Sequence, residues 1–180
     1  MTLPSYVSLL RILLIIPVCM LISKGNYPYN LYAFVIFILA AMTDYLDGYL
    51  ARKFDLESRL GALLDLLADK LLVCIVLIWI IKDLQNSFFL FPTMLILARE
   101  LIISSIRQFI SEKENFKELK VSFLGKSKTT FQLITISFFI LLSSQEKAFL
   151  FLGIMLWCSS LISIYSLFDY IYKWKDELSG

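Results

Sequence analysis

Long apolar runs alternate with short polar breaks along the whole 180-residue chain. The breaks contain glycine, proline, asparagine or charged residues, which are typical of loops between helices. Each run is close to the roughly 20 residues that a helix needs to cross a bilayer core about 30 Å thick. The pattern therefore predicts an all-α integral membrane protein with six transmembrane helices, over Pro4–Ile22, Tyr29–Leu50, Leu60–Ile81, Phe88–Ile110, Lys126–Leu142 and Lys147–Tyr172.

The composition supports the membrane class. Hydrophobic residues make up 59% of the chain, charged residues make up 18%, and the mean hydropathy is +0.77. Ordinary globular domains are about 45–50% apolar and about 25% charged, so a soluble helical protein is the disfavoured alternative. The length predicts a single domain over residues 1–180. The net charge of +2 gives no argument for nucleic acid binding, and the absence of histidine excludes histidine-based catalysis and histidine metal ligands.

The basic residues are divided unevenly between the breaks, and this division predicts the orientation of the chain. The first, third and fifth breaks hold one lysine each, at Lys24, Lys82 and Lys147. Three other segments are more basic: the second break, the fourth break with its junction into the next helix, and the C-terminal tail. These segments and both termini are expected in the cytoplasm. Their ten basic residues are Arg52, Lys53, Arg59, Lys113, Lys117, Lys120, Lys126, Lys128, Lys173 and Lys175.

Four aspartates interrupt the apolar sequence at the cytoplasmic ends of the second and third predicted helices. Asp44 and Asp47 are three residues apart, and Asp65 and Asp69 are four apart, so each pair shares one helix face. The short break Ala51–Arg59 makes the two helices antiparallel neighbours, so the four carboxylates are expected to converge. Like charges inside a membrane cannot all stay ionised without counter-charge. Oxygen-only ligands select Mg²⁺ or Mn²⁺, and Mg²⁺ commonly joins carboxylates to a substrate phosphate.

Small and basic residues near the aspartates are consistent with a phosphate site. Gly48 directly follows Asp47, and Gly61 lies one turn before Asp65 on the same face. Small residues allow a helix or a ligand to approach closely, although plain helix packing is an alternative explanation for Gly61. Arg52 can meet a diphosphate with its fork of donors, and its alternative role is that of a positively charged anchor on the cytoplasmic side.

The stretch from Asp44 to Asp69 resembles the signature of the CDP-alcohol phosphatidyltransferases, D-x2-D-G-x2-A-R-x8-G-x3-D-x3-D, and fills each fixed position. The resemblance implies a dimeric six-helix membrane enzyme that transfers a phosphatidyl or related group from a CDP-activated donor to an alcohol and releases CMP. It implies two Mg²⁺ or Mn²⁺ ions, with Asp69 as both metal ligand and general base. The implied metal ligands are Asp44, Asp47, Asp65 and Asp69, and the implied CDP-binding residues are Asp44, Gly48, Ala51, Arg52 and Ser58.

Basic residues in the fourth and fifth predicted helices form a second candidate site. Arg99 and Arg107 are eight residues apart, which is about 80° around a helix, so both can face one cavity. Lys126 and Lys128 stand at the start of the fifth helix, where backbone N–H groups also attract anions. A second basic site predicts an acceptor that is itself phosphorylated. Pairing of Arg99 with Glu100 or an aspartate, and a cytoplasmic positive cluster at the two lysines, are the alternative interpretations.

Four stretches follow one another as in bacterial members of the family that use glycerol 3-phosphate: LPSYVSLLRILLIIP, the acidic motif with its ADK ending, ARELIISSIRQ and LGKSKTTFQ. This resemblance implies transfer of a phosphatidyl group from CDP-diacylglycerol to glycerol 3-phosphate in phospholipid biosynthesis, by a homodimer in the bacterial inner membrane. Leu66 stands where that subfamily usually has proline, and Ser5 and Ser8 stand where it usually has asparagine and threonine.

Other functions fit part of the pattern. Within the family, inositol phosphate, serine or phosphatidylglycerol are alternative acceptors. An ion or proton transporter would explain the intramembrane aspartates, but it would not explain Arg52, Gly48 or the basic cluster. An intramembrane prenyltransferase also holds diphosphate through Mg²⁺ and aspartate-rich motifs. That class tends to have more helices and two separate motifs, so six spans and one compact motif disfavour it.

Overall fold

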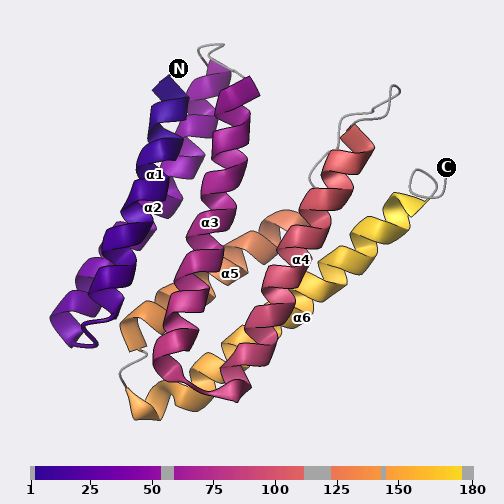
Figure 1. Ribbon diagram of the computed structural model, residues 1–180. Coiled ribbons are helices and arrows are strands. Elements are labelled where there is room, and N and C mark those ends of the chain that lie inside the picture. Colours follow the sequence, from indigo (N-terminus) through magenta and orange to yellow (C-terminus); the bar gives the residue numbers. More distant parts are fainter. Residues whose placement is uncertain (1–2, 54–58, 112–122, 143–144, 176–180) are drawn as a thin grey trace. The chain divides into compact units, whose positions relative to one another are not determined.

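A computed structural model of the chain describes residues 3–53, 59–111, 123–142 and 145–175 (Figure 1). Over these ranges it contains six α-helices, one short 3-10 helix and no strand, so the predicted all-α class is confirmed for the described residues. The elements are α1 (Leu3–Ile22), α2 (Tyr27–Lys53), α3 (Arg59–Leu84), α4 (Ser87–Ser111), α5 (Phe123–Leu142), η1 (Glu146–Ala148) and α6 (Phe149–Lys173).

The ends of the helices differ from the predicted ends by a few residues. For example, α2 continues to Lys53 rather than ending at Leu50, and α3 continues to Leu84 rather than Ile81. The prediction ended each helix where the apolar run stopped. Backbone hydrogen bonds continue past that point, because alanine, arginine, lysine and leucine are all good helix formers.

Three helices are long and apolar enough to cross a membrane, judged by length and composition over the described residues. These candidate spans are Ser5–Ile22, Ser87–Ile110 and Phe149–Lys173. Tyr27–Thr43 and Ser127–Leu142 are shorter apolar helices. The structure therefore supports an all-helical protein with three candidate spans, and the count of six spans stays a prediction.

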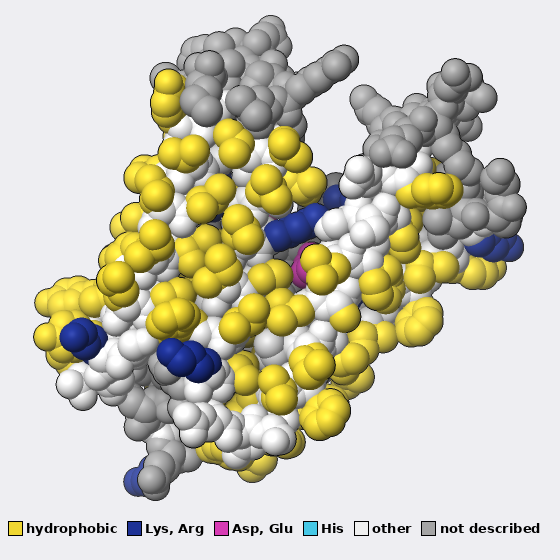
Figure 2. Space-filling view, viewed as in Figure 1, with side chains coloured by type: hydrophobic (Ala, Val, Ile, Leu, Met, Phe, Trp, Pro, Cys, Tyr) yellow, Lys and Arg dark blue, Asp and Glu magenta, His cyan; other side chains and the backbone are white. Residues whose placement is uncertain are grey.

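Large apolar side chains cover much of the outer surface in the view of Figure 2. Leu13 and Met20 on α1, Leu101 on α4 and Leu161 on α6 each expose more than half of their surface. Soluble monomers rarely expose wide apolar patches, whereas such residues are the normal lipid-facing surface of membrane helices. The exposed surface therefore agrees with a membrane location.

The chain groups into two compact units. Unit 1 contains α1, α2, α3 and the second part of α5, within Met1–Gln85 and Ile136–Phe149. Unit 2 contains α4, the first part of α5 and almost all of α6, within Asn86–Thr135 and Leu150–Gly180. The organisation of residues 1–180 as a single domain stays a prediction.

In unit 1, α1 packs against both α2 and α3, and consecutive helices run antiparallel (Figure 1). The beginning of α1, the end of α2 and the beginning of α3 therefore lie at the same end of the unit. Buried residues recur three or four positions apart on each helix, which gives each helix one packed face. They include Ile15, Val18 and Ile22 on α1, Ala33, Phe37 and Ala40 on α2, and Ala68, Leu72, Val76 and Ile80 on α3.

In unit 2, α4 and α6 run parallel. Phe88, near the start of α4, packs against Trp157 with ring centroids 6.2 Å apart. Arg99, the middle residue of α4, donates a hydrogen bond to Ser166, which lies further along α6. Because the contact positions advance in the same direction on both helices, basic residues of the second half of α4 face the second half of α6.

Replacing Gly153 by alanine is expected to destabilise the packing of α4 against α6. A Cβ at Gly153 would overlap Cε1 of the Phe88 ring, and it would lie 3.2 Å from Cζ. Overpacking typically costs about 1–3 kcal/mol. The measurement is thermal unfolding in detergent. Gly153→Ala should lower the unfolding temperature in the natural chain, but it should have little effect in a Phe88→Ala background, and equal effects in both backgrounds would rule out this contact as the cause.

Candidate active site

The guanidinium of Arg11 joins α1, α2 and α3 of unit 1. Its Nη1 donates to Oδ1 of Asp69 at 2.7 Å and to Oδ1 of Asp65 at 3.2 Å, both on α3. Its Nε donates to Oγ1 of Thr43 at 3.4 Å, and Thr43 immediately precedes Asp44 on α2. One side chain of α1 therefore marks the point where both halves of the acidic motif approach each other.

The helix faces explain why these groups meet. Arg11 lies four residues before Ile15 on the buried face of α1. Asp65 and Asp69 lie on the face of α3 that continues, three residues later, to the buried Leu72. Side chains three or four residues apart share a helix face, so the apolar packing of α1 against α3 also brings the arginine to the two carboxylates.

The predicted acidic site is described in part. Asp65 and Asp69 are close together, as predicted. The helix that carries the first half of the motif is described, but the side chains of Asp44, Asp47, Gly48, Ala51 and Arg52 lie outside the description, and Ser58 lies outside the described residues. The roles of these six residues stay predictions.

Asp65 and Asp69 fit a divalent cation in the chemistry of their side chains. Both carboxylates meet at one cationic nitrogen, and their side chains are 42% and 48% exposed. Carboxylate oxygens are hard ligands that suit Mg²⁺ or Mn²⁺. Among the side chains that the structure describes, no three candidate ligands gather into a metal site. Further ligands have to be supplied by other groups, for which Asp44 and Asp47 are the candidates.

A second group of charged side chains connects the helices of unit 2. Lys128 on α5 donates to Oε1 of Glu100 on α4, and Nη1 of Arg99 lies 3.5 Å from the same oxygen. Nη2 of Arg99 donates to Oγ of Ser166 on α6 at 2.9 Å. Arg99 and Lys128 are both buried. Two of the four predicted acceptor-site residues therefore share one partner, and the pairing of Arg99 with Glu100 is present as well.

Arg107 also faces α6. Its Cζ lies 5.8 Å from the ring centroid of Tyr170, which is within the range of a cation–π contact. The Nε atoms of Arg99 and Arg107 are both buried and have no hydrogen-bond partner among the described residues. Lys126 belongs to α5, but its side chain lies outside the description.

The described side chains of this basic cluster, defined as Arg99, Arg107, Lys128 and Glu100, comprise three cations and one carboxylate. Within the cluster, this leaves an excess of two positive charges. A phosphate dianion would match the excess and would accept charge-assisted hydrogen bonds from the arginines.

Sequence reasoning did not single out Arg11, Thr43 or Ser166. A signal for Arg11 was present, because a lone charge inside an apolar span is a functional candidate by default. A weaker signal for Ser166 was its spacing from Ser163 and Ser159, which places three hydroxyls on one face of α6, and all three are buried. Thr43 gave no signal other than its position next to the acidic motif.

Comparison with known proteins places the chain in a family. The family model described as CDP-alcohol phosphatidyltransferase matches residues 1–165. A CDP-diacylglycerol–glycerol-3-phosphate 3-phosphatidyltransferase of Wigglesworthia glossinidia brevipalpis is 36% identical over 179 residues, which cover 98% of this chain and 97% of that protein. One of the same name from Rickettsia typhi is 34% identical over 173 residues, which cover 93% and 94%. This protein belongs to the CDP-alcohol phosphatidyltransferase family.

Proposed function

We propose that this protein transfers a phosphatidyl group from CDP-diacylglycerol to glycerol 3-phosphate, with phosphatidylglycerophosphate and CMP as products. The observation that carries the proposal is the convergence of Asp65 and Asp69 beside the residue that precedes Asp44. The excess positive charge of the basic cluster supports a phosphorylated acceptor. The two relatives described above are named for this reaction, and they match the chain over nearly its whole length.

The donor is held by the acidic motif. Asp44, Asp47, Asp65 and Asp69 would hold two divalent ions, Mg²⁺ or Mn²⁺, which when bound neutralise the diphosphate and stabilise the departing CMP. Arg52 presents a planar fork of donors that suits the diphosphate. Gly48 and Ala51 leave room for the nucleotide beside α2 because their side chains are small. Asp44 and Ser58 complete the proposed CDP site.

Asp69 is the proposed general base. Its side chain is about half exposed, and Arg11 holds its Oδ1 at 2.7 Å, so a defined carboxylate is presented to the acceptor. It takes the proton of the acceptor hydroxyl as the hydroxyl oxygen attacks the phosphorus that carries the lipid. The new P–O bond forms, the bond between that phosphorus and the oxygen of CMP breaks, and CMP leaves.

The basic cluster binds the phosphate of the acceptor, together with Lys126. Arg99 and Arg107 both face α6 and each keeps a buried Nε, so each has a donor to offer a ligand. Glu100 holds Lys128 and Arg99 in place through one oxygen. Binding at a phosphate remote from the reacting hydroxyl orients that hydroxyl, and orientation of this kind raises the rate of the chemical step.

The proposed setting is the bacterial inner membrane. The exposed apolar helices support a membrane location. The uneven division of lysine and arginine between the breaks supports six spans with both termini and the active site at the cytoplasmic face. Membership in the family supports a homodimer as the proposed assembly.

Transfer is expected to depend strictly on a divalent cation, because the clustered carboxylates and the donor diphosphate both need counter-charge. The measurement is CMP release by purified protein supplied with CDP-diacylglycerol and glycerol 3-phosphate. Excess EDTA should abolish release, and excess Mg²⁺ or Mn²⁺ should restore it. Undiminished turnover in EDTA would contradict the metal-assisted mechanism.

A further inference from the structure

Arg11 is a charged side chain within the candidate span Ser5–Ile22, and it is completely buried. Charged residues inside membrane helices are costly and rare, and those present usually have a functional reason. In the reaction proposed above, the two divalent ions already supply the positive charge that the aspartates and the diphosphate need. The contacts of Arg11 therefore call for an explanation of their own.

The guanidinium is fixed on two sides. Its Nη1 contacts both carboxylates of α3, at 2.7 Å and 3.2 Å, while its Nε donates to Thr43 on α2. Thr43 is itself anchored, because its Oγ1 donates to the carbonyl of Ala40 at 2.8 Å. The planar group is thus set at a fixed angle between two helices.

This placement restrains the two aspartates from their buried side. Nη1 is bonded to Oδ1 of Asp65 and to Oδ1 of Asp69, and the arginine side chain has no exposed surface. The aspartate side chains nevertheless remain 42% and 48% exposed, so each keeps accessible surface in addition to its contact with Arg11. A lysine at position 11 would keep the charge and has three donors, but they all sit on one flexible ammonium. The planar guanidinium instead gives Nη1 to the two carboxylates and Nε, at a fixed distance from Nη1, to Thr43.

We propose that Arg11 is a positioning residue, which holds the carboxylates of Asp65 and Asp69 in the orientation that receives a divalent cation. The inference rests on the proposed function, because it takes these two aspartates as metal ligands. Groups that hydrogen-bond to ligating side chains typically change metal affinity by about 10–100-fold when they are replaced.

A simple counter-charge would have opposite consequences. If Arg11 served only to neutralise the aspartates, any cation at position 11 would suffice, and its removal would take away a charge that repels the metal ion. The positioning role requires the arginine geometry, so neither lysine nor glutamine can replace it.

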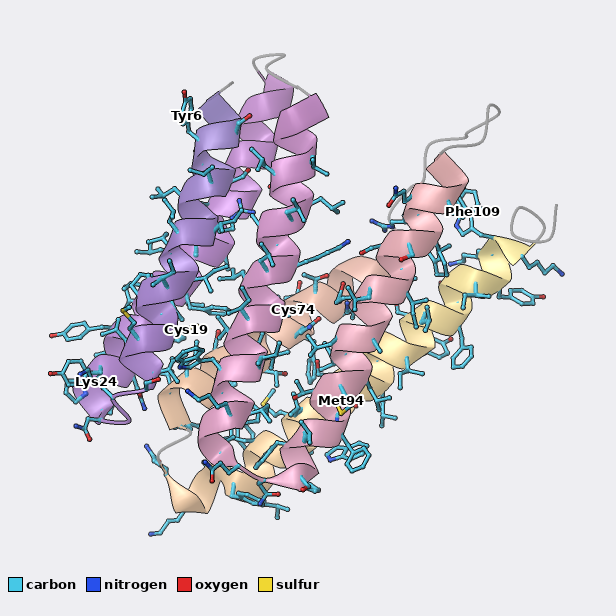
Figure 3. The ribbon with its side chains drawn as sticks, viewed as in Figure 1. Tyr6, Cys19, Lys24, Cys74, Met94 and Phe109 are labelled. Carbon is cyan, nitrogen blue, oxygen red and sulfur yellow. The ribbon has the colours of Figure 1, made fainter. Side chains whose placement is uncertain are left out.

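The test is a titration of purified protein with Mn²⁺, with free Mn²⁺ followed by electron paramagnetic resonance and with no donor or acceptor present. Arg11→Lys and Arg11→Gln are both expected to weaken Mn²⁺ binding by about 10-fold or more. At saturating Mn²⁺, both should lower kcat while the KM for glycerol 3-phosphate stays unchanged. Lys24→Gln is the matched control, because Lys24 is exposed and lies just after the end of α1, at the end opposite Tyr6 (Figure 3).

Mn²⁺ affinity equal to that of the natural protein in Arg11→Lys, or tighter binding in Arg11→Gln, would overturn the positioning role. If Arg11→Gln does not elute as a folded protein from size-exclusion chromatography, Arg11→Lys decides the question alone. If the natural protein turns over and binds Mn²⁺, and the Arg11 variants bind Mn²⁺ equally well, only this inference is refuted. A natural protein that binds no Mn²⁺ would refute the proposed metal site together with it.

Discussion

Replacing Asp69 by asparagine is expected to remove nearly all phosphatidyl transfer while the protein still inserts and folds. Asparagine keeps the shape of the side chain and an oxygen for Nη1 of Arg11, which lies 2.7 Å from Oδ1 of Asp69. It cannot accept a proton from the attacking hydroxyl, however. The loss of a general base lowers a rate by about 10²–10⁴-fold. The measurement is turnover of CDP-diacylglycerol and glycerol 3-phosphate by purified variants with equal folded fractions.

The role of Asp69 as metal ligand has to be separated from its role as base. Bound Mn²⁺ should therefore be measured on the same samples, and the turnover should be compared at saturating metal. Asp169→Asn is the matched control, because Asp169 lies outside the acidic motif, on α6, where its contact is a 2.7 Å ion pair with Lys173. Turnover by Asp69→Asn equal to that of the natural protein would exclude Asp69 as the base.

Replacing Arg107 by alanine is expected to weaken the use of glycerol 3-phosphate far more than the use of CDP-diacylglycerol. The guanidinium lies over the ring of Tyr170, and its buried Nε has no partner among the described residues, so it has a donor for a ligand. Without Arg107, the desolvated phosphate of the acceptor would have fewer hydrogen-bond partners. The expected loss of binding free energy is about 2 kcal/mol or more, which corresponds to a fall of about 30-fold in kcat/KM for glycerol 3-phosphate.

The pattern of the kinetic loss distinguishes the acceptor site from a packing role. Steady-state rates at saturating donor should show a raised KM for glycerol 3-phosphate, with a lower kcat as well if the phosphate fixes the attacking geometry. The variant should also discriminate less between glycerol 3-phosphate and glycerol. Lys173→Ala, which removes an exposed cation from α6, is the control and should behave as the natural protein. Unchanged acceptor kinetics in Arg107→Ala would leave contact with Tyr170 as the role of Arg107.

The order of the helices and the convergence of two aspartates could be predicted from the sequence because both depend on local spacing. Apolar runs of near-spanning length require helices, and the four-residue interval between Asp65 and Asp69 puts both on one face. In the structure both carboxylates bond the same nitrogen of Arg11, and the convergence of all four aspartates stays a prediction. The exact ends of the helices were predicted less accurately. Hydropathy reports burial in lipid, whereas the helix backbone also continues through polar residues such as Arg52 and Lys53.

The partners of the charged groups could not be predicted, because they depend on how separate helices pack. The helix that carries Arg11 is apolar on nearly every side, so hydropathy does not indicate which face is buried. Only the packing of α1 against α2 and α3 shows that Arg11 faces the acidic residues. In unit 2, Lys128 and Glu100 are 28 residues apart in sequence, and Arg99 and Ser166 are 67 apart. Contacts across such separations are set by tertiary structure.

The most direct test of the account is a product assay with a panel of alcohols. Purified protein would receive CDP-diacylglycerol, Mg²⁺ and equal amounts of glycerol 3-phosphate, glycerol, inositol phosphate, serine and phosphatidylglycerol, and the lipid products would be identified by mass. The account predicts phosphatidylglycerophosphate as the main product, formed in equal amount with CMP. A different main product, or consumption of the donor without any of these products, would contradict it.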